Sequence, residues 1–90
     1  MNSDILISEE TYEDLFKSFR KQKLIVARPS SISIIKKEDY WMITLSLNPG
    51  TYRRASTYMT YKPLFAFIKN QIISQTKIDK VSIQWEIVRN

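Results

Sequence analysis

The residues with the greatest capacity for chemistry in this sequence are adjacent pairs of carboxylates. These pairs are Glu9/Glu10, Glu13/Asp14 and Glu38/Asp39. A magnesium site needs carboxylates that converge from separate structural elements. The first two pairs lie at the start of an expected helix, where the helix dipole favours acidic residues. The third lies in an expected turn, where aspartate bonds to the local backbone. The spacing therefore predicts no metal site.

A second chemical arrangement is Tyr58 close to Arg53 and Arg54, since a tyrosine supported by arginines is one form of nucleophile. A tyrosine on the surface of a strand explains the same residue more simply, because aromatic residues favour strands. The chain has no histidine and no cysteine, so the most frequent general base and the strongest nucleophile are missing. A single glycine leaves no glycine-rich phosphate loop. We predict a protein that is not an enzyme and that binds no cofactor.

The charge of the chain is unevenly distributed. The formal net charge is +5, from 14 basic and 9 acidic residues. Every charged residue from 15 to 37 is basic, and the same holds from 40 to 78, with only Glu38 and Asp39 between. Such stretches favour an anionic partner, either nucleic acid or an acidic protein surface. The alternative is that the charge only keeps a small protein soluble.

Two segments have the apolar spacing of helices. Residues 8–22 begin with Ser8 as a good N-cap and place acidic residues in the first turn and basic residues at the end. The second helix is expected from Pro63, a residue suited to a first helical turn, to Thr76. Its expected buried stripe consists of Leu64, Phe65, Ile68 and Ile72.

Alternating apolar and polar residues predict strands between and after these helices. The expected strands are residues 31–37, 40–48, 52–61 and 80–89, with a short extra one at 24–28. Asn48, Pro49, Gly50 and Thr51 give the strongest turn signal in the chain. The predicted fold class is α+β: two helices packed on one face of an antiparallel sheet of about four strands, in the order α-β-β-β-α-β, in one domain that spans residues 1–90.

Strand parity divides the expected sheet into two faces. The face beneath the helices should hold Trp41, Ile43, Leu45, Ala55, Met59, Ile83 and Trp85. The opposite face should hold small polar residues together with Arg54 and Tyr58: Ser31, Ser33, Thr44, Ser46, Ser56, Thr60, Ser82 and Gln84. This second face is either an ordinary solvated face or an open binding surface.

We consider two binding functions. The first is nucleic-acid binding, in which basic side chains contact phosphates and tyrosines stack on bases. Its expected site residues are Lys36, Lys37, Tyr40, Tyr52, Arg53, Arg54 and Tyr58. The alternative is a protein-interaction module that acts as an adaptor, subunit or inhibitor of a larger machine. Phe67 and Ile73, which lie off the buried stripe of the second helix, are its expected contact residues, supported by Ile35 and Met42.

The last predicted strand, residues 80–89, is expected at an edge of the sheet. An unpaired edge favours pairing with a second chain, so a homodimer through this strand is one prediction. The longest apolar stretches are far too short to span a bilayer, and no secretory signal is visible. We therefore expect a cytoplasmic protein with no membrane partner.

Overall fold

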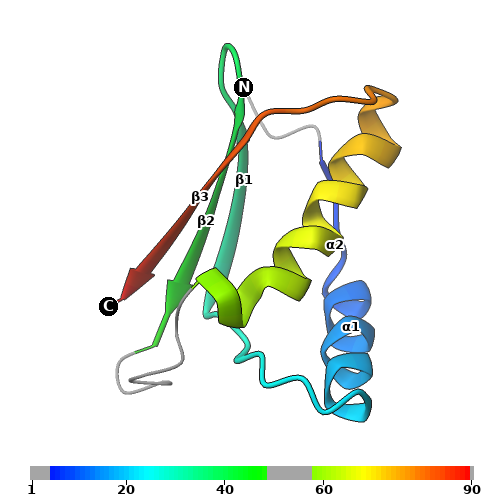
Figure 1. Cartoon of the computed structure of the whole chain (residues 1–90), viewed down its shortest axis with the longest axis vertical. Helices are drawn as coiled ribbons and strands as arrows, with labels where there is room; N and C mark the ends of the chain where they lie inside the picture. The colour runs from blue at the N-terminus through cyan, green and yellow to red at the C-terminus, as the bar shows by residue number, and fades with distance from the viewer. Residues whose placement is uncertain (1–4, 49–57, 90) are drawn as a thin grey trace.

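The chain folds as a small sheet with two helices on one of its faces (Figure 1). The computed structural model describes residues 5–48 and 58–89. In chain order the elements are α1 (Glu9–Lys21), β1 (Ser31–Lys36), β2 (Trp41–Leu47), α2 (Tyr58–Thr76) and β3 (Ile83–Arg89). The strand order is β1-β2-β3, with β1 antiparallel and β3 parallel to β2. The α+β class with two helices is thus confirmed.

Helix α1 has the ends that its sequence predicts. The Ser8 hydroxyl accepts a hydrogen bond from the Thr11 backbone N–H at 3.1 Å, which satisfies one of the free donors of the first turn. The helix ends where Lys23 adopts a left-handed conformation with φ of 61°. There the Leu24 N–H donates to the Phe19 carbonyl at 2.9 Å, the bond of a Schellman motif. Phe16 and Phe19 form the buried side of the helix.

The predicted sheet of about four antiparallel strands is wrong. The described elements follow the order α-β-β-α-β and form a mixed sheet of three strands. Of the predicted strand at 52–61, residues 52–57 lie outside the described residues, and residues 58–61 form the first turn of α2. The predicted extra strand at residues 24–28 is a loop in the structure.

The early start of α2 has a physical cause in its buried stripe. Tyr61 is fully buried and lies three, four and seven residues before Leu64, Phe65 and Ile68, which are also buried. This is helical spacing, so the apolar stripe begins before Pro63 rather than after it. Pro63 therefore lies inside the helix and does not mark its first turn. Because α2 now connects β2 to β3, these strands pair in parallel, as a helical crossover allows.

The core lies between the sheet and the helices. Along β2, residues of one parity are buried and those between them are half-buried, which confirms the predicted inward face of Trp41, Ile43 and Leu45. The register extends this face across the sheet, because Ile43 is opposite Ile34 of β1 and Trp85 of β3. The Trp85 ring lies 4.1 Å from the Phe65 ring of α2, centroid to centroid.

Two residues assigned to the inward face of the sheet do not have that position. Met59 is in the first turn of α2 and is 70% exposed, because the segment that contains it is helical rather than extended. Ala55 lies outside the described residues. Among the described residues, no helix is long and apolar enough to cross a membrane.

Candidate functional site

The predicted nucleic-acid site lies only partly within the described residues. Tyr52, Arg53 and Arg54 lie outside the described residues, and Tyr58 is the first residue of α2 instead of a strand residue. The other three predicted residues, Lys36, Lys37 and Tyr40, do lie together at the β1–β2 turn. The Lys37 N–H donates to the Tyr40 carbonyl at 2.7 Å, and Lys36 Nζ is 6.0 Å from the centroid of the Trp41 ring.

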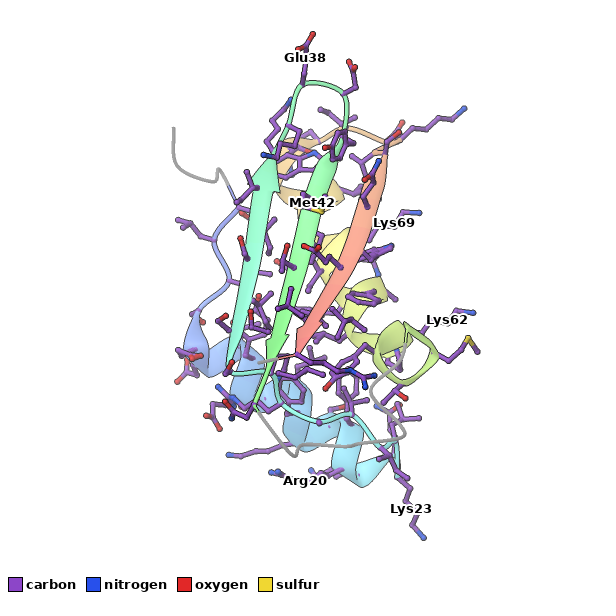
Figure 2. All side chains as sticks on the ribbon, turned by 90° about the vertical axis from the view of Figure 1, so that its left-hand side faces the viewer. Arg20, Lys23, Glu38, Met42, Lys62 and Lys69 are labelled. Atoms are coloured by element: carbon purple, nitrogen blue, oxygen red, sulfur yellow. The ribbon has the colours of Figure 1, made fainter. Side chains whose placement is uncertain are left out.

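The face of the sheet opposite the helices is open, and Figure 2 views it with Met42 on the central strand, toward the end that carries Glu38. The register places small polar residues there, as predicted, since Ser31 is opposite Ser46 and Ser33 is opposite Thr44. Among the strand positions of this face, Glu86 is the one charged residue, and it accepts a hydrogen bond from the Thr44 hydroxyl at 3.4 Å. The strand positions of this face therefore present no positively charged side chain that could bind an anion.

The basic residues near the end of α1 form a separate group. Lys17, Arg20 and Lys21 lie on the exposed side of the helix, and Lys23 follows directly. Figure 2 shows Arg20 and Lys23 together at one end of the molecule. Arg28 differs from these residues because its guanidinium bonds to Glu9 at 3.1 Å and to Glu13 at 2.8 Å.

Phe67 and Ile73, the residues predicted to contact a protein partner, are both half-buried. Phe67 packs against the core cluster with part of its side chain, and the rest is exposed. Contact of Phe67 and Ile73 with a protein partner stays a prediction. Ile35 and Met42 do lie on the open face, where Ile35 is exposed and Met42 is half-buried.

The outer edge of β3 has the properties of a binding surface. β3 is the last strand in the sheet order, which confirms the predicted edge position of this segment. Its inward-facing residues Ile83, Trp85 and Ile87 are only half-buried, whereas Ile43 and Leu45 on β2 are 0% exposed. The core is thus covered at the centre of the sheet and open along this edge.

A hollow of about 380 Å³ lies between this edge and α2. Lys62 and Lys69 of α2 line it together with a mainly apolar floor: Phe65, Ala66, Val81, Ile83 and Trp85. The four α2 residues are at positions i, i+3, i+4 and i+7, which share one helix face. In Figure 2, Lys69 lies beside the first half of β3, and Lys62 lies farther to the side, level with its second half.

The backbone N–H and C=O groups of β3 point toward β2 at one residue and away from β2 at the next. The Trp41 N–H donates to the Ser82 carbonyl at 2.8 Å, so even-numbered residues of this segment bond to β2. In a regular parallel ladder the N–H and C=O groups of the intervening residues point away from the partner strand. The outward groups are therefore those of Ile83, Trp85 and Ile87. The side chains of Ile83 and Trp85 also line the hollow.

The opposite flank of the sheet differs because a chain segment covers it. Ile5 is buried, and Ile5 and Ile7 lie against Ile32 and Ile34 of β1 around a small hollow of about 190 Å³. The side-chain amide of Gln75 holds this segment in place through bonds to the backbone of Leu6. Among the described residues, β3 has no corresponding cover.

A larger open groove, of about 710 Å³, separates α1 from residues 23–28. It combines Arg20 and Lys23 with Leu24 and Ile25, and the Ile25 side chain is 68% exposed. The described residues contain no group of three or more His, Cys, Asp or Glu that could hold a metal ion. The groove therefore offers cations and apolar surface.

The sequence did contain a signal for the β3 edge. The last strand alternates apolar residues, and Lys62, Phe65, Ala66 and Lys69 have the spacing of one helix face. These two patterns become one site only when α2 lies beside β3. That placement follows from the parallel crossover, which the predicted antiparallel sheet excluded.

Comparison with known proteins gives no relative from which a function could be transferred. The chain matches no protein-family model, no curated protein and no solved structure. A function for this chain must therefore be inferred from the geometry of its described residues.

Proposed function

We propose that this protein is a protein-interaction module, and that an extended segment of its partner pairs with the outer edge of β3. The observation that carries the proposal is the half-burial of Ile83, Trp85 and Ile87 on an edge strand beside a hollow. A partner strand would complete the ladder and cover these side chains. Strand addition to an exposed sheet edge is a recurring mode of peptide recognition.

The backbone of the edge favours a polypeptide over a nucleic acid. Outward N–H and C=O groups alternate along β3, and another strand can satisfy both kinds of group in register. A nucleic acid offers phosphate acceptors to the N–H groups, but its donors and acceptors do not alternate at the spacing of a β-strand. The hollow adds specificity, because its apolar floor accepts alternate side chains of the added strand.

The test is a selection of peptides from a random nine-residue display library on the immobilised chain, followed by amide exchange in the complex. Selected peptides should slow exchange at the N–H groups of Ile83, Trp85 and Ile87. The variant Ile87→Pro should abolish binding, since proline removes an outward donor and leaves the β2–β3 ladder intact. Ile87→Ala is the matched control, because it truncates the same side chain and keeps the N–H group.

Two results would contradict the proposal. One is a set of selected peptides that bind the proline and alanine variants with equal affinity. The other is binding that leaves exchange at the three outward amides unchanged, since a strand added at this edge must bond to them.

A second candidate function is nucleic-acid binding at the C-terminal end of α1. The observation that favours it is the exposed group of Lys17, Arg20, Lys21 and Lys23, in a stretch of sequence without acidic residues. Phosphate contacts from this group would make the affinity fall steeply with salt. Its test is fluorescence anisotropy of a labelled single-stranded RNA, in which Arg20→Gln/Lys21→Gln should reduce the salt slope by about two.

A further inference from the structure

We propose that the partner segment is acidic, with two carboxylates that bind Lys62 and Lys69 and one apolar side chain between them over Trp85. The inference rests on the proposed function and adds the chemistry of the partner. The expected pattern is acidic-x-apolar-x-acidic, in which the three specified side chains point toward the helix-covered face of the sheet.

The backbone of β3 sets the alternation in this pattern. In an antiparallel pair, residues directly opposite each other place their side chains on the same face. Partner residues opposite Ile83, Trp85 and Ile87 therefore lie on the helix-covered side of the sheet, and the two between them lie on the open side. The residue opposite Trp85 meets the apolar pair of Trp85 and Phe65, which line the hollow and whose ring centroids are 4.1 Å apart.

The two lysines set the spacing of the carboxylates. Lys62 and Lys69 are seven residues apart on α2, which is about 10 Å along the helix axis. Partner residues four apart in a strand span about 13 Å, and the flexible lysine stems cover the difference. Residues two apart span only about 7 Å and leave no inward position between them for the apolar side chain.

The signs of the surrounding charges select the face on which the carboxylates lie. Lys62 and Lys69 line the hollow, and Lys80 precedes the strand. On the open face of β3 the charged residue is Glu86, which would repel an acidic partner residue placed there. A carboxylate is therefore favoured on the inward side of the added strand and disfavoured on the other.

The same charges disfavour a second copy of this chain as the occupant. Antiparallel pairing of two β3 edges would bring Lys62 and Lys69 of both copies to one seam. The residues that line the hollow include no acid to neutralise them. Like charges brought together at a closed interface oppose association, whereas an acidic segment meets the two lysines with opposite charge.

The experiment compares two synthetic peptides of identical composition, TVETLTEVT and TVTELETVT, each labelled with fluorescein and measured by anisotropy. The first places both glutamates and the central leucine on the inward side, and the second moves the glutamates to the open side. We expect the first peptide to bind at least tenfold more tightly. The protein variant Lys62→Gln/Lys69→Gln should remove this difference, whereas Lys17→Gln/Lys21→Gln, with the same loss of charge on α1, should preserve it.

A third peptide, TVETLTEVT with the leucine amide methylated, separates the two levels of the proposal. Loss of binding on methylation supports pairing with β3, because that amide donates to the Trp85 carbonyl in the proposed register. Equal affinity of the two unmethylated peptides, each lost on methylation, would overturn the acidic pattern and leave edge pairing intact. Unchanged binding of the methylated peptide would overturn edge pairing itself. Two further results would overturn the acidic segment as the occupant. One is a dimeric mass in sedimentation at the assay concentration, and the other is displacement of the peptide by single-stranded RNA at equimolar concentration.

Discussion

The Gln75 side chain holds the N-terminal segment on the domain, and its removal should release that segment. The Leu6 N–H donates to Gln75 Oε1 at 3.0 Å, and Gln75 Nε2 donates to the Leu6 carbonyl at 2.9 Å. The amide thus satisfies both backbone groups of Leu6, as a neighbouring strand would. The adjacent Ile5 is buried in the core cluster, so the clamp and the burial act on the same segment.

The expected effect of Gln75→Ala follows from these two bonds. Each exposed hydrogen bond contributes about 0.5–1.5 kcal/mol net, so the variant should lower the free energy of local opening by roughly 1–2 kcal/mol. Because 1.4 kcal/mol corresponds to a factor of about ten, exchange of the Leu6 amide should accelerate roughly five- to thirtyfold. Burial of Ile5 still favours the docked segment, and because the two bonds are also lost on global unfolding, the global unfolding free energy should fall by a similar amount.

Amide exchange measured by NMR tests this expectation, and the chain offers a matched control. Gln71 Oε1 accepts a hydrogen bond from Gln75 Nε2 at 3.2 Å, but the backbone groups of Leu6 bond to Gln75 and not to Gln71. The variant Gln71→Ala should therefore leave exchange of the Leu6 amide nearly unchanged. The variant Gln75→Glu keeps the acceptor for the Leu6 N–H and should give an intermediate rate. Equal acceleration in the Gln71 and Gln75 variants, or none in either, would refute the clamp.

Three further predictions concern stability. Burial, with a smaller contribution from Glu9, raises the pKa of Tyr12 from 10.0 to about 12. The folded state therefore holds this proton more tightly, and the associated stability is present below pH 10 and lost as the pH rises toward 12. Because Tyr12 is only half-buried and solvent screens it, urea unfolding should show a loss of about 1–2 kcal/mol relative to Tyr12→Phe across that window, and parallel profiles would contradict it. Ser8→Ala should destabilise the fold by about 1 kcal/mol in urea, and Ser8→Asn should not. Lys77 has φ of 63° at the end of α2, so Lys77→Gly should raise the thermal midpoint, with a net gain of about 0.5 kcal/mol; a lowered midpoint would exclude strain there.

Local signals were sufficient to predict α1 and the β1–β2 hairpin. The cap at Ser8, the acidic first turn and the basic last turn all indicate the same helix, and each acts within a few residues. The hairpin alternation is equally local, and its register places Ile32 opposite Leu45 on the inward face. A sequence predicts such elements well because neighbouring residues determine both their conformation and their amphipathic pattern.

The prediction of a strand at residues 52–61 is wrong where the period of a strand and the period of a helix overlap in the sequence. Strand alternation puts Met59 and Tyr61 on one face, but Tyr61 also belongs to the helical stripe of Leu64, Phe65 and Ile68. Four residues cannot distinguish a period of two from one of 3.6. Pro63 added to the error, since proline favours a first helical turn but is found here inside the helix. Tertiary burial of Tyr61 decides the conformation, and it is not visible in the local sequence.

The same helical crossover that removes a predicted strand also creates the candidate site. An antiparallel meander would have placed another strand between β2 and the end of the chain. The parallel β2–α2–β3 unit instead brings β3 directly beside β2 and places the Lys62–Lys69 face of α2 along its outer edge. The N-terminal segment covers the flank at β1, and no described residue pairs with the outer side of β3. Within the described part of the chain neither outer edge is paired with a strand, but the N-terminal segment packs against β1, whereas the β3 edge carries a tryptophan, an apolar hollow and two cations.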